Sequence, residues 1–294
     1  MEVTIFEKSK KVLAKVEVSG GGRCNCTNSF ESVRDLSQVY PRGHRLMKRL
    51  FKTFNYRDAY QWFENHGVRL VTQEDECVFP ASQDSHTIIN LFLAEARRHH
   101  IDIRTQNKIE SLDQLKDFDY IAVTTGGASA GSATVLSTVP ELVEGVPSLF
   151  TFSIADEALR GLMGTVVEAA TAYIPGTNFK ASGPLLITHW GMSGPAILKL
   201  SSYAARELHD HQYQMPLAVN WCSEKDAAVQ QELQSIIVRH PQKQLATIRP
   251  FNLPSRLWSY LLEKTLGERA QYRWQHLTQK DLNRLTNCLC NDGY

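Results

Sequence analysis

The chain has 294 residues, of which 43% are hydrophobic and 21% charged, and its formal net charge at pH 7 is +1. This composition is typical of a globular protein with room for about two domains. Six cysteines are too few for a disulfide-built scaffold, and the balanced charge creates no overall field that would attract nucleic acid or a membrane surface. We therefore expect a small-molecule substrate, with no nucleic-acid partner and no membrane partner; the oligomeric state stays open.

The N-terminal residues MEVTIFEKSKK lack a basic lead followed by a long apolar run, and no window approaches eighteen consecutive apolar residues. Neither a signal peptide nor a membrane span is expected, so the prediction is a cytoplasmic protein. Two cysteine pairs have C-x-C spacing, at residues 24–26 and 288–290. Because zinc sites usually need C-x₂₋₄-C with matching partners, we predict no metal site.

The first half of the chain alternates strand-like and helix-like segments. Strands are predicted at residues 2–6, 68–72, 76–80, 101–105 and 108–112, and residues 119–127 (DYIAVTTGG) predict a buried strand. Helices are expected between Gly43 and Gly67, with Asn55 and Asp58 as a capping pair, and after Asp84. The alternation indicates an α/β fold with a parallel sheet.

A basic stripe accompanies the helix that follows Gly43. Its apolar residues Leu46, Leu50, Phe51 and Phe54 recur at helical spacing and predict a buried face. Between them stand Arg42, Arg45, Lys48, Arg49 and Lys52. We interpret these as a solvated helix face, not as a nucleic-acid patch.

The pattern changes after Pro147. Residues 147–154, 164–174 and 183–190 read as strands without helices between them, which favours a small antiparallel sheet or barrel. Ser193 is expected to cap a helix with Pro195 in its first turn, residues 215–221 predict another strand, and residues from 224 onward read as short amphipathic helices.

The stretch SGGGRCNCTN, residues 19–28, is the strongest candidate for a ligand loop. Consecutive glycines permit positive φ and a close approach of main chain, and successive amides can form a concave anion-binding nest. Arg23 adds a fork of donors beside it. A tight turn needs fewer than three glycines, so we favour a loop that holds a diphosphate or an electron-rich ring.

Three other features are ambiguous from the residues alone. Glu7 ends the first predicted strand, where a carboxylate can bind a ribose hydroxyl pair, but the residues alone favour an ordinary surface carboxylate. Residues 124–127 (TTGG) suit either a cofactor passing close to main chain or a plain turn. His189, in THWGMSGP (188–195), could move a proton near neutral pH, but the spacing alone favours a structural turn.

Taken in order, the segments "IFEKSKK…KVEVSGGGRCNCTN", "VFPAS", "AVTTGG", "VPSLFTF" and "GPLLITHWGMSGPAILKLS" resemble the YhiN/BaiN-type flavoproteins over almost the whole chain. These are FAD-containing oxidoreductases of the NAD(P) type. The resemblance implies a Rossmann-like FAD-binding domain, incomplete at both ends, at residues 1–146. It also implies an inserted β-barrel at residues 147–223 and a helical part of the insertion at residues 224–294.

The resemblance also implies site residues. Glu7, with Lys8 beside it, would face the adenosine ribose, and Ile109 would offer main chain to the adenine. The loop made of Ser19, Gly20, Gly21, Gly22, Arg23, Cys24 and Asn25 would follow the diphosphate toward the flavin ring. Thr125, Gly126 and Gly127 would line the cofactor, and His189 would handle a proton on the substrate side. The implied reaction passes hydride between NAD(P)H or an organic substrate and FAD, with an enone or bile-acid type double bond as one such substrate.

Two departures from the family pattern accompany this resemblance. Members begin with a strand and a G-x-G-x-x-G turn before the acidic strand, and end with a second glycine-rich segment, whereas this chain starts at the acidic strand and stops at NDGY. Residues 127–145 also lack the helical face expected there. We therefore expect a fragment of such an enzyme, and keep two alternatives: a non-catalytic remnant, and a simple nucleotide- or anion-binding module.

Overall fold

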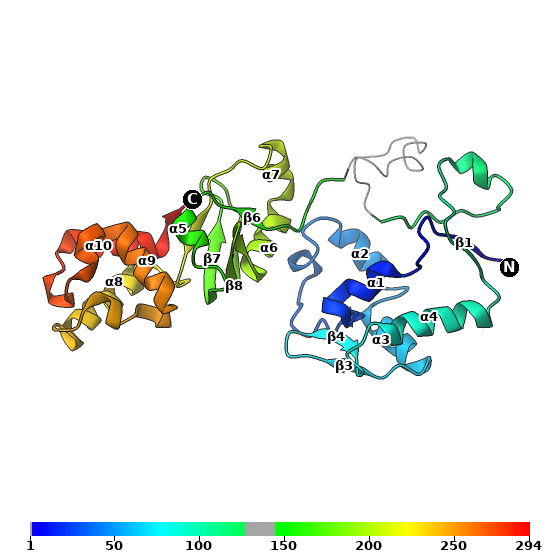
Figure 1. Cartoon of the computed structure of the whole chain (residues 1–294), viewed down its shortest axis with the longest axis horizontal. Coiled ribbons are helices and arrows are strands. Elements are labelled where there is room, and N and C mark those ends of the chain that lie inside the picture. Colours follow the sequence, from blue (N-terminus) through cyan, green and yellow to red (C-terminus); the bar gives the residue numbers. More distant parts are fainter. Residues whose placement is uncertain (1, 127–144) are drawn as a thin grey trace. The chain divides into compact units, whose positions relative to one another are not determined.

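The computed structural model describes residues 2–126 and 145–294 of the chain (Figure 1). The chain divides into two compact units, Met1–Gly145 and Val146–Tyr294. The expectation for residues 127–144 lies outside the described residues.

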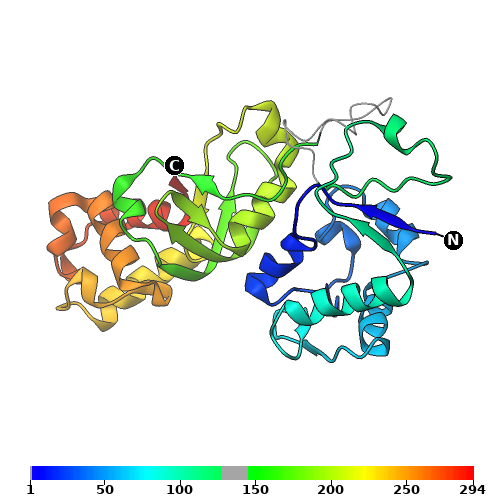
Figure 2. The same ribbon diagram turned by 45° about the vertical axis from the view of Figure 1, so that its right-hand side comes forward.

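In its described residues, 2–126 and 145, the first unit has short strands and four helices. Its elements are β1 (Thr4–Phe6), α1 (Ala14–Val18), a 3₁₀ turn (Ser19–Gly22), β2 (Thr27–Asn28), a 3₁₀ turn (Leu36–Gln38), α2 (His44–Leu50), α3 (Tyr56–Asn65), β3 (Leu70–Thr72), β4 (Cys77–Pro80), α4 (His86–Arg98), β5 (Asp102–Arg104) and a 3₁₀ turn (Leu112–Leu115). Strands β1 and β5 run side by side in parallel (Figure 2). In this pairing Ile5 lies opposite Ile103. Strands β2, β4 and β3 form a separate antiparallel sheet.

A small core fixes the first unit. Its buried members come from the glycine loop, the antiparallel sheet and α4: Cys24, Val68, Leu70, Val78, Ile88 and Leu91. Helix α4 buries Ile88, Ile89 and Ala96, as its predicted apolar face requires. The predicted capping pair at the start of α3 is also confirmed, because Asn55 and Asp58 form a reciprocal capping box.

Three predictions for this unit are wrong. Residues 108–112 form no strand, and residues 119–126 are exposed and outside any strand. The parallel sheet of the described residues pairs only β1 with β5, so no ladder holds residues 119–126 extended, and the side chain of Tyr120 is 89% exposed. The predicted buried face of α2 is also incorrect, since Leu46, Leu50 and Phe54 are exposed.

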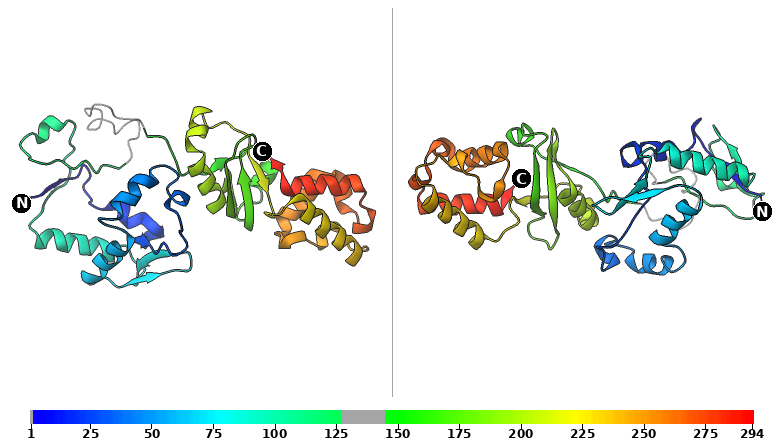
Figure 3. Two further views of the ribbon diagram at one scale, coloured as in Figure 1. Left: turned by 180° about the vertical axis from the view of Figure 1, so that it is seen from behind. Right: turned by 90° about the horizontal axis from the view of Figure 1, so that it is seen from below.

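The second unit consists of an antiparallel sheet and six helices. The elements are β6 (Phe152–Ser153), α5 (Glu157–Arg160), β7 (Val166–Tyr173), β8 (Lys180–Thr188), β9 (Gly191–Ser193), α6 (Pro195–Tyr203), α7 (Ala205–Asp210), β10 (Ala218–Asn220), α8 (Asp226–Arg239), α9 (Ser255–Leu266), α10 (Gln279–Cys290) and β11 (Asp292–Gly293), with 3₁₀ turns between α8 and α10. The strand order is β11-β10-β7-β8-β9-β6. Figure 3 shows α8, α9 and α10 grouped beside this sheet within the unit.

The second unit has a large continuous core. Its largest fully buried side chains include Trp221, Trp258 and Trp274. The indole of Trp258 stacks on that of Trp274 and donates to the backbone oxygen of Leu245 at 2.9 Å. Helix α6 packs on β8 and β7 through residues such as Ile197 and Leu200. The second unit is therefore organised around one continuous apolar core that joins the sheet to its helices.

Candidate functional site

The glycine loop has three consecutive residues in the left-handed backbone region. Gly20, Gly21 and Gly22 have φ values of +55°, +67° and +84°, in the left-handed region that glycine enters at little cost. A Cβ atom on Gly20 would lie 2.8 Å from both the Asn25 amide nitrogen and a ring carbon of Phe79. On Gly21 it would meet nothing within 4 Å. The loop thus packs tightly on one side and is open on the other.

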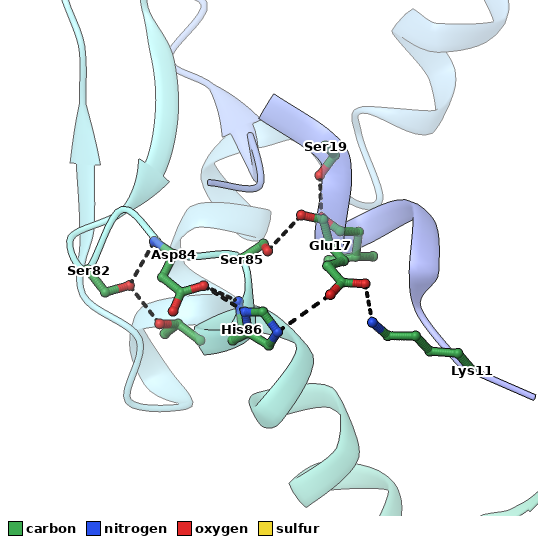
Figure 4. A network of polar contacts seen from close by, with 9 residues as sticks. Lys11, Glu17, Ser19, Ser82, Asp84, Ser85 and His86 are labelled. Atoms are coloured by element: carbon green, nitrogen blue, oxygen red, sulfur yellow. Dashed lines mark hydrogen bonds and ion pairs between the residues drawn. The ribbon is translucent and has the colours of Figure 1, made fainter. Parts of the chain in front are cut away.

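Several bonds hold the loop in place. The Cys24 side chain is buried in the core of the unit, and its amide donates to the Ser19 oxygen at 3.0 Å. The Ser19 hydroxyl donates to Val16 at 2.8 Å. At the start of α4, the Ser85 amide donates to the Gly22 oxygen at 2.9 Å. The Ser85 hydroxyl donates to the backbone oxygen of Glu17, also at 2.9 Å (Figure 4). The loop is therefore fixed before any ligand arrives.

Arg23 lies along the loop on a rigid support. Its guanidinium is 4.1 Å from the centroid of the Phe79 ring, its Nε donates to the Gly20 oxygen at 3.1 Å, and it also donates to the Gln83 side chain at 3.3 Å. Guanidinium groups hold their charge at any ordinary pH and stack well on aromatic rings. Arg23 therefore presents a fixed positive charge beside the glycines.

Asn25 and Cys26 complete the loop. The Asn25 side-chain amide, with its nitrogen turned toward the backbone, donates to Thr27 at 2.7 Å and to Val78 at 3.2 Å, which pins the loop to β4. Burial raises the pKa of the Cys26 thiol to about 12, so this thiol stays protonated. No cluster of three or more metal-ligating side chains occurs among the described residues.

Glu7 directly follows β1 and extends its pairing with β5. Its amide donates to Arg104, and its oxygen accepts from Asn107, each at 2.9 Å. The backbone amide of Ser9 donates to the Glu7 carboxylate at 2.7 Å and lowers the pKa of that carboxyl, with Lys8 and Lys15 adding smaller effects of their charge. Glu7 is therefore an ionised acceptor at neutral pH, the form that a ribose hydroxyl pair binds.

The structure brings a residue to this site that the sequence analysis missed. The Lys15 ammonium lies against Gly126, where an added Cβ would be only 2.9 Å from its nitrogen. Lys15 also acts electrostatically on Glu7 and belongs to α1, the helix that leads into the glycine loop. Lys15 lies four residues, about one helical turn, before Ser19. This spacing was the feature of the sequence that could have indicated that Lys15 belongs to the site.

The other predicted site residues are placed as follows. Ile109 is half-buried in the segment after β5, and Thr125 and Gly126 are exposed outside any regular element. Gly127 lies outside the described residues. Lys15 is thus the link that places the residues around Gly126 beside α1.

Beneath the loop, charged side chains surround the start of α4 (Figure 4). Glu17 pairs with Lys11, which lowers the pKa of the Glu17 carboxyl, and it lies 3.7 Å from Nε2 of His86. Nδ1 of His86 lies 2.9 Å from the Asp84 carboxylate. Asp84 also accepts from the His86 amide at 2.9 Å, but Ser85, not Asp84, occupies the cap position of α4.

His189 belongs to the second unit, in the turn between β8 and β9. Its ring is exposed and meets the ring of Trp190 edge-on at 4.4 Å. The Trp190 nitrogen donates to Thr151 at 3.1 Å. The predicted capping by Ser193 is wrong, because Ser193 ends β9 and Gly194 occupies the cap position of α6. Only glycine fits at this position, since a Cβ atom there would lie 2.8 Å from the Pro184 oxygen.

The geometry supports one chemical role for the first unit. The segments around β1, α1 and α4 supply four groups. These are the ionised carboxylate of Glu7, the left-handed glycines 20–22 with one open side, the guanidinium of Arg23 and the ammonium of Lys15. This set suits a ligand with ribose hydroxyls and a diphosphate. Apart from the Lys15 ammonium, these are groups that the resemblance implies for the adenine-dinucleotide part of FAD.

No described helix has the length and hydrophobicity that a membrane-spanning segment needs.

Comparison with known proteins gives relatives of two kinds. A 3-dehydro-bile acid delta(4,6)-reductase of Clostridium scindens is 23% identical, over 77% of this chain and 60% of the relative. Ribosomal RNA dihydrouridine synthases of Haemophilus influenzae and Escherichia coli are 23% and 25% identical, over 89% and 98% of this chain and 68% and 73% of their own lengths. The chain thus spans 60 to 73% of these relatives.

Family comparison covers nearly the whole chain. Residues 1–144 match the HI0933-like protein Rossmann domain, and residues 146–291 match the HI0933-like protein barrel and H2TH domain. These matches confirm both the resemblance to YhiN/BaiN-type flavoproteins and the fold class inferred from the motifs. The chain belongs to the HI0933-like family.

Proposed function

We propose that this chain is an FAD-dependent oxidoreductase that reduces an activated carbon–carbon double bond, with NAD(P)H as the source of hydride. The observation that carries the proposal is the fixed glycine loop with Arg23 beside it. An anionic diphosphate gains both main-chain amides and a permanent positive charge there, without first ordering the loop.

The substrate class follows from what the relatives have in common. A bile acid delta(4,6)-reductase and a dihydrouridine synthase are each named for the reduction of a carbon–carbon double bond conjugated to a carbonyl. When bound, FAD supplies the hydride transfer that no amino-acid side chain can perform.

The residues of this chain would bind and orient the cofactor. Glu7 would accept from ribose hydroxyls, the amides of Gly20 to Gly22 and the side chain of Arg23 would hold the diphosphate, and Lys15 would add charge beside Gly126. His189, in the second unit, is kept as the proposed proton donor, because reduction of a double bond requires a proton at the second carbon.

The test is the visible absorbance spectrum of the purified chain, followed by titration with FAD. A flavin band that co-purifies or appears on titration is expected. Arg23→Ala should raise the Kd for FAD about tenfold, because one charge-assisted contact is lost. Arg97→Ala, an exposed residue of α4 far along the helix from the loop, is the matched control and should leave the Kd unchanged.

A chain that stays colourless and ignores FAD would contradict the proposal and favour the alternative of a non-catalytic remnant. Binding of ADP as tight as that of FAD would instead favour the nucleotide-binding module. Equal FAD affinity of Arg23→Ala and the unsubstituted chain would remove Arg23 from the site.

A further inference from the structure

Two buried cysteines of the second unit lie together although they are far apart in the sequence. Cys222 follows shortly after β10, and Cys290 is the last residue of α10. The Trp221 amide donates to the Leu289 backbone oxygen at 2.8 Å, so the residues just before the two cysteines are bonded to each other. Both thiols are free, and the two residues are 8% and 2% exposed.

The turn after β10 contacts both sulfur atoms. The Asn220 side chain donates to the Glu224 backbone oxygen at 2.7 Å, and its own oxygen accepts from the Cys222 amide at 3.2 Å and from the Cys222 thiol at 3.4 Å. The Cys290 thiol reaches the same Glu224 oxygen at 3.9 Å. One turn, residues 220–224, therefore holds the two thiols in the same place.

The two thiols also interact directly, and this interaction makes them chemically unequal. A hydrogen bond from Cys290 lowers the pKa of the Cys222 thiol; burial opposes this effect and the Glu224 amide supports it. The same hydrogen bond raises the pKa of the Cys290 thiol, and burial and the Asp226 carboxylate raise it further. Cys222 is thus the thiol that becomes a nucleophilic thiolate more readily, while Cys290 keeps its proton.

The C-x-C spacing at residues 288–290 is not the pair that the fold brings together. Residues two apart on a helix do not face each other. Burial raises the pKa of the Cys288 thiol to about 11, and the charge of Lys264 acts on it from α9. Cys290 instead faces the turn after β10, so its partner is Cys222.

We propose that Cys222 and Cys290 are a redox-sensitive pair, which hydrogen peroxide converts to a reversible disulfide. The Cys222 thiolate attacks one peroxide oxygen, the O–O bond breaks, and the departing hydroxide takes up the proton that Cys222 gave up. Cys222 is then a sulfenic acid. The Cys290 sulfur attacks the Cys222 sulfur, and the Cys290 proton passes by way of the Asp226 carboxylate to the hydroxide that leaves. The two thiols lose two electrons, and the peroxide is reduced to two molecules of water.

The surroundings of the pair suit a small oxidant. Cys222 is the more exposed of the two cysteines, and the next residues, Ser223 and Glu224, are exposed. The disulfide joins the turn after β10 to the end of α10 and so closes the chain between residues 222 and 290. A bond between such distant residues restricts the unfolded chain and raises the stability of the folded unit.

The first test is peptide mapping of the full folded chain with and without hydrogen peroxide, in the Cys288→Ser variant. Trypsin separates the two cysteines into peptides 207–225 and 285–294, and this substitution leaves Cys290 as the single cysteine of its peptide. After free thiols are blocked with N-ethylmaleimide, mass spectrometry should find the two peptides joined, and dithiothreitol should separate them. Peptides that stay separate, or that join only in urea, would overturn the proposal.

Trapping with dimedone, which reacts with sulfenic acids, tests the two roles. Peroxide-treated Cys290→Ser should be labelled at Cys222, whereas Cys222→Ser should stay unlabelled at Cys290. Asp226→Asn should form the disulfide about tenfold more slowly and accumulate the sulfenic acid, because the proton acceptor is lost. Glu263→Gln, an exposed carboxylate of α9, is the matched control and should leave the rate unchanged. Labelling of Cys290 in place of Cys222 would overturn the mechanism, and equal rates for the Asp226 variant and its control would remove Asp226 from it.

Thermal unfolding tests whether the bond forms within the native fold. Oxidation should raise the Tm of the chain and of Cys288→Ser by about 5–10 °C, and should leave the Tm of Cys222→Ser and Cys290→Ser unchanged. Each variant is compared with its own dithiothreitol-reduced sample, so a loss of stability from the substitution itself does not enter. A Tm that falls on oxidation would contradict the native position assigned to the pair.

Discussion

Gly20 and Gly21 are neighbours with nearly the same backbone conformation but different surroundings. Both have positive φ, at +55° and +67°. An added methyl group would lie 2.8 Å from the Asn25 nitrogen at Gly20 and would meet nothing within 4 Å at Gly21. The pair therefore separates the cost of backbone conformation from the cost of close packing.

We expect Gly20→Ala to destabilise the chain by about 3 kcal/mol and to abolish measurable FAD binding, because the loop must leave β4. Gly21→Ala should cost about 1–2 kcal/mol, the left-handed penalty alone. Urea unfolding and FAD titration measure both effects. Equal losses of stability for the two variants would mean that the contact with Asn25 and Phe79 does not shape the loop.

At the scale of elements, the connection from β8 through β9 to α6 depends on backbone packing. Gly194 has φ +92°, and a Cβ there would lie 2.8 Å from the Pro184 oxygen and 2.9 Å from the Leu186 amide. The neighbours are main-chain atoms of β8, which cannot turn aside as a side chain can. The helix therefore starts at Pro195 with no side-chain cap, and its position is set by packing on the strand.

Gly194→Ala should destabilise the second unit by more than about 3 kcal/mol, since both conformation and contact oppose it. Gly176→Ala, at φ +79° in the turn between β7 and β8, has nothing within 4 Å and should cost only about 1–2 kcal/mol. Thermal unfolding followed by tryptophan fluorescence gives the comparison. A Gly194→Ala variant as stable as Gly176→Ala would contradict the packing argument.

At the scale of the whole molecule, the two units differ in how they are held together. The first has a small core around Cys24 and Val78, whereas the second buries three tryptophans together with an ionised carboxylate. Asp281 is 1% exposed, bonded to the Arg269 guanidinium at 2.9 and 2.7 Å and to Thr278. Burial opposes its ionisation, but the hydrogen bonds from Thr278 and the charge of Arg269 outweigh it and lower the pKa of this carboxyl.

A lowered folded-state pKa means that this stabilisation is fully present above about pH 4, the ordinary value for Asp, and is lost as pH falls through the folded value. Asp281→Asn should therefore cost about 2–4 kcal/mol at pH 7 and progressively less below pH 4. Fluorescence of the buried tryptophans, all in the second unit, reports the unfolding. A cost that does not change between pH 7 and pH 3 would show that ionisation of Asp281 is irrelevant to stability.

The sequence by itself determined the features that depend on neighbours along the chain. Left-handed glycines at residues 20–22, the capping box at Asn55, the strand at residues 77–80 and the buried face of α4 all follow from local conformation and periodicity. The motifs around the glycine loop and THWGMSGP were sufficient for the family. The glycine conformations and the capping box are specified within a few residues, whereas the strand and the buried face of α4 also needed the partners that pair with them or cover them.

Only the tertiary structure decided which of these segments meet and which side of each is covered. The apolar run at residues 119–123 reads as a buried strand, yet it is exposed because no described strand pairs with it. Leu46, Leu50 and Phe54 have the spacing of a core face, yet they are exposed, whereas Phe51 packs edge-on against the Phe30 ring. Lys15 joins the site because α1 places it against Gly126, more than a hundred residues away. Burial and contact depend on partners far apart in the chain, and a local pattern does not specify those partners.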